Sequence, residues 1–128
     1  MTDLTKLGNP EARADGVLEV FPVDDASLEI ALDCSEFTCR CPVTGQPDWA
    51  TIEIRYRPAG RVVETKSLKL YLETYREAGI FHEHAARQIR DDLVAALDPA
   101  ELSVTMRFNR RGGIAVAATS SYPPVPAS

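Results

Sequence analysis

Cys41 and Asp48 flank a short run, Pro42-Val43-Thr44-Gly45-Gln46-Pro47, that is rich in turn-forming residues. Proline cannot donate a backbone hydrogen bond and glycine tolerates turn conformations, so this run predicts a tight loop with Cys41 at the end of a strand. A thiolate is a strong nucleophile, and a nearby carboxylic acid can protonate the group that the thiolate attacks. The pairing therefore suggests covalent catalysis by Cys41 with Asp48 as the acid.

Each member of this pair also has an ordinary interpretation. A lone cysteine at a strand end is more often part of the packed interior than a nucleophile. An aspartate in a turn commonly binds its own backbone. The combination of thiol, loop and acid is what favours chemistry here.

Composition limits the functions that this chain can have. Its 128 residues predict one domain, and a net charge of -5 disfavours nucleic-acid binding. No apolar run is long enough to cross a membrane, and residues 1–15 lack the apolar core of a signal peptide. Three cysteines in such a chain favour reactive thiols in a reducing cytoplasm. We expect a cytoplasmic protein without nucleic-acid or membrane partners.

Hydrophobic periodicity divides the chain into expected strands and helices. Alternation of period two indicates strands, and apolar residues every three or four positions indicate helices. In chain order, the elements are strands over 28–41 and 51–57, helices over 68–79 and 81–98, and strands over 102–108 and 114–119. The very short link between the helices makes them antiparallel neighbours. The pattern predicts an α+β fold, with an antiparallel sheet covered on one face by the helical pair.

The domain is expected to span residues 15–120, with a flexible arm over 1–14 and a proline-rich tail over 121–128. Two strand pairs leave sheet edges that so small a monomer must protect. Pairing of sheets between subunits would protect them, so we expect a homo-oligomer.

Charged residues elsewhere could bind a ligand. Lys66 and Lys69 share one helical face and could hold phosphate groups, although an exposed helix start is the ordinary interpretation. Glu83, beside His82, could accept two hydrogen bonds from a guanine-like edge, or it could only complement the helix dipole. Arg111 could contact a phosphate or belong to a plain hairpin turn.

Together these segments resemble the NADPH-dependent 7-cyano-7-deazaguanine reductases, the nitrile reductases of queuosine biosynthesis, in their short single-domain form. The resemblance covers about residues 28–118 and rests on Glu36-Phe37-Thr38, Cys41–Asp48, Glu64–Tyr71, Phe81-His82-Glu83 and Arg111–Ile114. It implies the tunnelling fold, in which subunits join their sheets into a ring, two rings stack, with a decamer as one such assembly, and active sites lie between subunits.

The resemblance also implies roles for individual residues. Cys41 would attack the nitrile carbon of 7-cyano-7-deazaguanine to give a thioimide, and Asp48 would protonate the nitrile nitrogen. His82 and Glu83 would recognise the base. The other implied residues are Val63, Glu64 and Thr65 in the substrate pocket and Lys66, Lys69 and Arg111 at the phosphates of NADPH.

The chain departs from the family where many members carry a second cysteine, just after the His-Glu pair, that protects the nucleophile in a disulfide. Ala85 stands near that point here. Cys34 and Cys39 are candidate substitutes, although a bridge from Cys39 to Cys41 would be strained.

Two other functions are compatible with parts of the sequence. The amidine-forming enzymes of archaeosine synthesis share the fold and the thioimide but use ammonia and no NADPH, and the lysine motif argues against them. A zinc-binding interaction module could use Cys34, Cys39, Cys41, His82 and His84. Their spacing fits no standard zinc finger, and we expect no metal.

Overall fold

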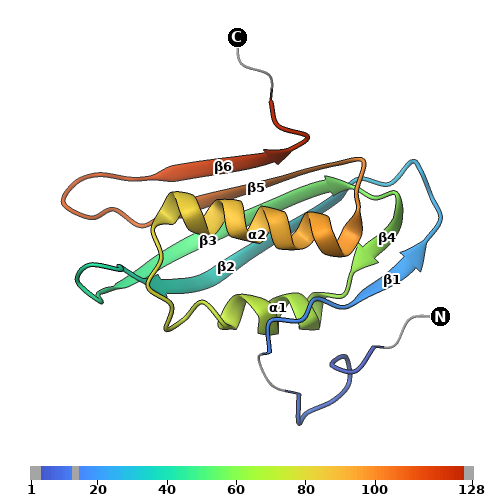
Figure 1. Ribbon diagram of the computed structural model, residues 1–128, viewed down its shortest axis with the longest axis horizontal. Helices are drawn as coiled ribbons and strands as arrows, with labels where there is room; N and C mark the ends of the chain where they lie inside the picture. The colour runs from blue at the N-terminus through green and yellow to red at the C-terminus, as the bar shows by residue number, and fades with distance from the viewer. Residues whose placement is uncertain (1–3, 13–14, 126–128) are drawn as a thin grey trace.

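The protein folds into an antiparallel sheet with both helices on one face (Figure 1). The computed structural model describes residues 4–12 and 15–125. The sheet has the order β2-β3-β5-β6. Its strands are β2 (Ile30–Arg40), β3 (Pro47–Arg57), β5 (Glu101–Phe108) and β6 (Ala117–Tyr122), and the helices are α1 (Thr65–Glu73) and α2 (His82–Leu97). The predicted α+β fold is confirmed.

A second, two-stranded sheet was not expected from the sequence. It pairs β1 (Val20–Val23) with β4 (Gly60–Val63) in antiparallel register, so that Val20 faces Val63. Each strand has four residues. Segments this short do not show a clear alternation, which is why periodicity alone did not find them.

The first helix is shorter than predicted. It ends at Glu73 and not near Gly79, and residues 74–81 form a longer link to α2 than the very short turn that was expected. The hydroxyl of Thr74 donates to the carbonyl of Tyr71 at 2.6 Å. Side chains of this kind compete with the helical backbone pattern. Tyr75 continues the apolar period and is buried, but it does so from a turn.

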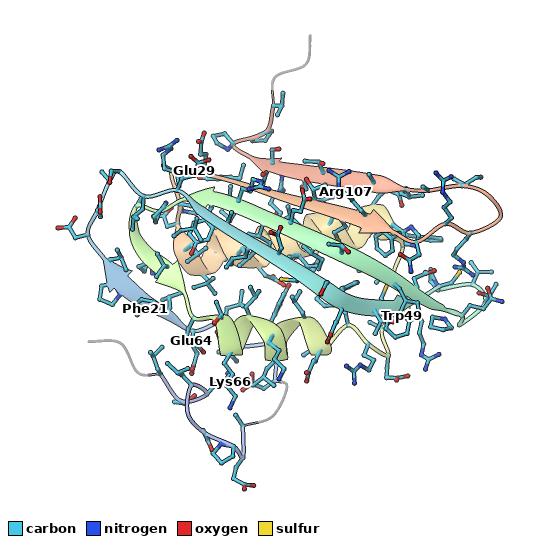
Figure 2. The ribbon with its side chains drawn as sticks, turned by 180° about the vertical axis from the view of Figure 1, so that it is seen from behind. Phe21, Glu29, Trp49, Glu64, Lys66 and Arg107 are labelled. Carbon is cyan, nitrogen blue, oxygen red and sulfur yellow. The ribbon has the colours of Figure 1, made fainter. Side chains whose placement is uncertain are left out.

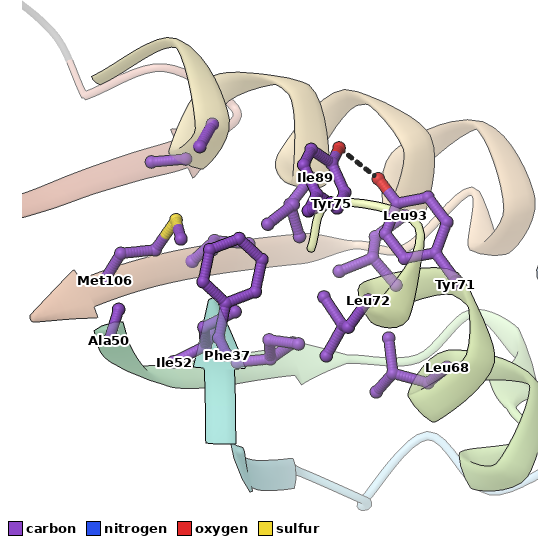
Figure 3. Packing of buried hydrophobic residues seen from close by; sticks show 14 of the residues in the cluster. Phe37, Ala50, Ile52, Leu68, Tyr71, Leu72, Tyr75, Ile89, Leu93 and Met106 are labelled. Atoms are coloured by element: carbon purple, nitrogen blue, oxygen red, sulfur yellow. Dashed lines mark hydrogen bonds between the residues drawn. The ribbon is translucent and has the colours of Figure 1, made fainter. Parts of the chain in front are cut away.

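The core lies between the sheet and the helices, as Figure 3 shows from close by. Its largest fully buried apolar side chains are Tyr56, Ile52, Ile54, Ile89, Leu93, Leu97, Met106 and Val104. The opposite face of the sheet carries polar side chains such as Glu53 and Arg107, whose Oε1 and Nε atoms lie 3.6 Å apart (Figure 2). An antiparallel sheet with one solvated face produces the alternation that the sequence shows.

The described part of the predicted arm is attached to the domain. The carboxylate of Glu19 accepts hydrogen bonds from the backbone N–H groups of Thr5 and Lys6 and from the Thr5 hydroxyl, at 2.5 to 3.1 Å. The ammonium of Lys6 donates to the Val17 carbonyl at 3.2 Å, and Lys6 is only 4% exposed. Thr5 and Lys6 of the predicted arm are therefore held against the domain.

The predicted tail begins inside the sheet. β6 runs to Tyr122, which pairs with Leu102, so the tail's first two residues belong to a strand. The remaining parts of the arm and tail predictions, over 1–3, 13–14 and 126–128, lie outside the described residues. In the part of the chain that the structure describes, no helix has the length and apolar character needed to cross a bilayer.

Candidate active site

Cys41 lies directly after the last residue of β2, in the loop that joins β2 to β3. Its backbone N–H donates to the Gln46 carbonyl at 2.8 Å, and the Gly45 N–H donates to the Cys41 carbonyl at 2.9 Å. Gly45 has φ of 73°, a left-handed conformation that favours glycine. These bonds close the loop, and Cys41 stands at a strand end as the turn residues predicted.

The Cys41 thiol is set up to ionise near neutral pH. Its pKa is lowered to about 7, first by a hydrogen bond from the Thr44 hydroxyl and then by the backbone N–H groups of Thr44 and Val43. The charge of Arg111 lowers this pKa further. At pH 7, a large share of Cys41 is therefore thiolate, the nucleophilic form.

Cys39 shows the opposite behaviour. Its side chain is fully buried, and burial, with the charges of Asp48 and Cys41, raises its pKa to about 11. Burial also raises the pKa of Cys34. All three cysteines are free in this structure. Only Cys41 combines partial exposure with a stabilised thiolate.

Asp48 is the buried centre of a cluster that includes the partly exposed side chains of Arg111 and His82. It lies on β3, is 3% exposed, and accepts a hydrogen bond from Nη1 of Arg111 at 2.5 Å on its Oδ1. Nε2 of His82 lies 3.2 Å from Oδ2. Buried carboxylates need such partners, because burial without them costs several kcal/mol. Segments far apart in sequence, the start of α2 and the β5–β6 connection, thus converge on one residue of β3.

Two further contacts fix this cluster. The His82 ring stacks on Phe108 at the end of β5, with ring centroids 3.6 Å apart and planes 6° apart. Nη2 of Arg111 donates to Oε1 of Gln46, which ties the β5–β6 connection to the Cys41 loop. Cys41, Asp48, His82 and Arg111 therefore form one site at this end of the sheet.

Of the other predicted site residues, those at the junction of β4 and α1 lie away from this site. Val63 is the last residue of β4, and Thr65 is the first of α1. In Figure 1 this junction is beside β1, whereas the β2–β3 loop is at the opposite end of the sheet. Glu83 adjoins His82 in the first turn of α2, with its side chain exposed. The candidate residues of one chain therefore form two separate groups. One is at the Cys41 end of the sheet, and the other, residues 63–69, is near β1.

A family model described as QueF-like protein matches residues 47–125. The chain belongs to this family. A relative from Frankia casuarinae, named NADPH-dependent 7-cyano-7-deazaguanine reductase, is 74% identical over 93% of this chain and 95% of its own. A relative of the same name from Syntrophus aciditrophicus is 46% identical over 95% of this chain and 88% of its own.

The fold of the QueF-like family is also found by comparison with solved structures. The crystal structure of an archaeosine synthase described as QueF-Like, in its apo form, matches with a TM-score of 0.71 over 77% of this chain and 96% of its own. The identity is 24%, so this likeness shows the fold alone. It confirms the predicted tunnelling fold.

Glu64 of this QueF-like chain caps α1. The backbone N–H groups of Lys66 and Ser67 donate to its carboxylate at 2.5 and 2.9 Å, and Glu64 is 3% exposed. Both carboxylate oxygens are thus used by the helix start, which is the ordinary interpretation of this motif. Of its neighbours, Val63 is buried and Thr65 is exposed.

A cavity of about 330 Å³ lies between β2 and α1, and Thr65 and Lys69 are among the residues that line it. Cys34 lines the same cavity, away from the Cys41 loop. Lys66 instead donates from Nζ to the carbonyl of Asn9 at 2.6 Å. The two lysines thus stay close to one another on α1, one beside the cavity and one beside the N-terminal segment.

Several residues of the site were missed by the sequence reasoning. Thr44 and Gln46 lie inside the predicted loop, so their polar side chains beside a candidate thiol were an available signal. Phe108 is simply the last apolar residue of an alternating strand, and nothing local marks it as the ring beneath His82. Within residues 4–12 and 15–125, no three histidine, cysteine or acidic side chains are gathered to hold a metal ion. The zinc-module alternative therefore gains no support.

Proposed function

We propose that this QueF-like chain uses NADPH to reduce the nitrile of 7-cyano-7-deazaguanine to an aminomethyl group, in queuosine biosynthesis for tRNA modification. Relatives that bear the name of this activity match nearly the whole chain at 74% and 46% identity. The observation that carries the proposal is the Cys41 thiol, with its pKa near 7, beside the Asp48 cluster. These relatives favour the reductase over the archaeosine-forming sibling.

In the first step, the Cys41 thiolate attacks the nitrile carbon. A carbon–sulfur bond forms, one π bond of the nitrile breaks, and the nitrogen takes a proton from Asp48 to give a covalent thioimide. In the present state Oδ1 of Asp48 accepts a hydrogen bond from Arg111, so this guanidinium must release Oδ1 before that atom can carry a proton. His82, beside Oδ2, is placed to pass a proton to the carboxylate.

The lysines on α1 fit the phosphates of NADPH. Lys69 is exposed beside the cavity, and the ammonium of Lys66 donates to a neutral backbone carbonyl, that of Asn9, which an anion can replace. Bound NADPH supplies the hydride, and two equivalents are needed because a nitrile gains four electrons in becoming an aminomethyl group. Arg111 lies at the other end of the sheet from these lysines, so after leaving Asp48 it would meet the phosphates beside the lysines of a neighbouring subunit. Lys66→Ala and Lys69→Ala should raise the NADPH concentration needed for half-saturation.

We propose a homo-oligomeric ring with active sites between subunits. β2 and β6 are the two edges of the main sheet, and their free backbone groups can pair with another chain. Within one subunit, the two groups of candidate residues lie at opposite ends of the sheet. A ligand that contacts both groups must therefore bind between two subunits. Two stacked rings, such as a decamer, remain a prediction that light scattering on the purified chain tests. Cytoplasmic location also remains a prediction.

The function itself is tested by turnover. The purified chain should consume NADPH only when 7-cyano-7-deazaguanine is present, with two NADPH oxidised for each aminomethyl product found by mass spectrometry. Ammonia should not be needed. Formation of an amidine product from ammonia without NADPH would replace the proposal with the archaeosine-type reaction.

Glu83 is expected to recognise the deazaguanine. Its exposed carboxylate can accept hydrogen bonds from a ring N–H and an exocyclic amine. Glu83→Leu would leave those donors unpaired at about 1 to 3 kcal/mol each, so substrate affinity should fall well over tenfold. Calorimetry on a Cys41→Ala background measures this without adduct formation.

The control for this substitution is Glu29→Leu, which removes another exposed carboxylate just before β2. It should leave the affinity unchanged. Equal affinity in Glu83→Leu and its parent would reduce Glu83 to a residue that only complements the helix dipole of α2.

A further inference from the structure

The loop that carries Cys41 is attached to the link between the two helices. The backbone N–H of Arg40 donates to the Ala78 carbonyl at 2.9 Å, and the Ile80 N–H donates to the Arg40 carbonyl at 3.0 Å. This pair of bonds adds a short parallel bridge to the end of β2. Both backbone polar groups of the residue directly before the nucleophile are therefore bonded to residues 78–80.

The same link also packs directly against the loop. A Cβ atom on Gly79 would lie 3.2 Å from Cα of Pro42, which is closer than side-chain atoms normally approach. Glycine lets the two backbones come this near, whereas a larger residue would have to push Pro42 away by a few tenths of an ångström. Residues on both sides of Cys41 thus contact residues 78–80.

The side chain of Arg40 makes the third connection. Its Nη1 donates to the Gly45 carbonyl at 3.0 Å, and its Nε donates to Oε2 of Glu77 at 2.8 Å. The guanidinium of Arg40 therefore connects the end of β2 to Gly45 on the far side of the loop. Glu77 orients this guanidinium. Gly45 is also the residue whose N–H binds the Cys41 carbonyl.

We propose that Arg40, oriented by Glu77, is a positioning residue for the nucleophile and holds the loop in the shape that places Val43 and Thr44 against the Cys41 thiol. The proposal rests on the proposed function only for the role of Cys41. The side chains of Arg40 and Glu77 are 39% and 74% exposed. Exposed ion pairs contribute little to overall stability, so loss of Arg40 should leave the fold intact and change the loop.

The test measures the Cys41 thiol directly. Iodoacetamide is applied over a range of pH, and peptide mass spectrometry follows the alkylation of Cys41. In the parent, the midpoint of the alkylation profile should lie near the pKa of about 7. In Arg40→Ala it should move up by about half a unit, which lowers the rate at pH 7 roughly twofold, because less thiolate is present. The other titratable groups around the thiol, which are Arg111, Asp48, His82 and Cys39, are unchanged in this variant.

Further variants separate positioning from simple charge. Arg40→Lys keeps the charge but cannot make both hydrogen bonds, so most of the shift should persist. Glu77→Ala should shift the midpoint in the same direction by less, and the double variant should equal Arg40→Ala, since Glu77 acts through Arg40. Arg87→Ala is the matched control, because its pair with Asp91 on α2 does not touch the loop.

The outcomes divide clearly. A midpoint in Arg40→Ala equal to that of Arg87→Ala would overturn the proposal. Full rescue by Arg40→Lys would also overturn it, because the charge alone would then be sufficient. A loss of turnover without a shifted midpoint would overturn it too, because it would point to a general structural effect. If Arg40→Ala does not fold, Arg40→Lys and Glu77→Ala decide. Alkylation needs neither nitrile nor NADPH, so it gives an answer even if the nitrile-reductase proposal fails.

Discussion

Cys41→Ala should abolish nitrile reduction, with kcat lowered at least about a thousandfold, because the alanine side chain cannot form the thioimide. Intact-protein mass spectrometry measures the covalent step by itself. Incubated with 7-cyano-7-deazaguanine and no NADPH, the parent should gain the mass of the substrate, and Cys41→Ala should not. The thiolate share of Cys41 should grow as the pH is raised through about 7, and the rate of adduct formation should rise with it, since the pKa of Cys41 is lowered to that value.

Cys34→Ser is the matched control for this substitution. Cys34 is the other partly exposed cysteine, and it lines the cavity between β2 and α1. It should retain the adduct and most of the activity. An adduct that persists in Cys41→Ala would show that the nucleophile lies at another residue.

Asp48→Asn should lower kcat by roughly a hundredfold to ten-thousandfold, the range typical of a lost general acid. The amide keeps the shape of the carboxylate, but it cannot deliver the proton that the nitrile nitrogen needs. Adduct formation should slow together with turnover, because attack by Cys41 and protonation of the nitrogen belong to one step. Rapid-mixing kinetics with mass-spectrometric detection measures both.

Glu53→Gln is the control for Asp48→Asn. Glu53 lies on the same strand but on the solvated face, where its partner is Arg107. It should leave kcat unchanged. Thermal unfolding of both variants tests whether the charged cluster around Asp48 merely supports the fold. Activity of Asp48→Asn within about threefold of the parent would contradict the role of Asp48 as the acid.

The sequence by itself determined the local features of this protein. The prolines and glycine between Cys41 and Asp48 specified the loop, and period-two alternation specified β3 and β5. Helical spacing ended by Asp98 and Pro99 specified α2, which runs over His82–Leu97. These signals could be interpreted because each depends on neighbours in the chain, through turn chemistry or the period of one element. The short strands β1 and β4 and the early end of α1 lack such a signal.

Tertiary structure decided which of the candidate residues meet. Asp48 contacts His82 and Arg111 because the start of α2 and the β5–β6 connection both reach the same end of β3. The same fold leaves Lys66 near the opposite end of the sheet and brings Glu77 to Arg40. Such contacts depend on strand order, register and the path of the links, which no local pattern encodes. For that reason, the sequence supplied the candidate nucleophile and the candidate acid, and only the structure showed which side chains contact them.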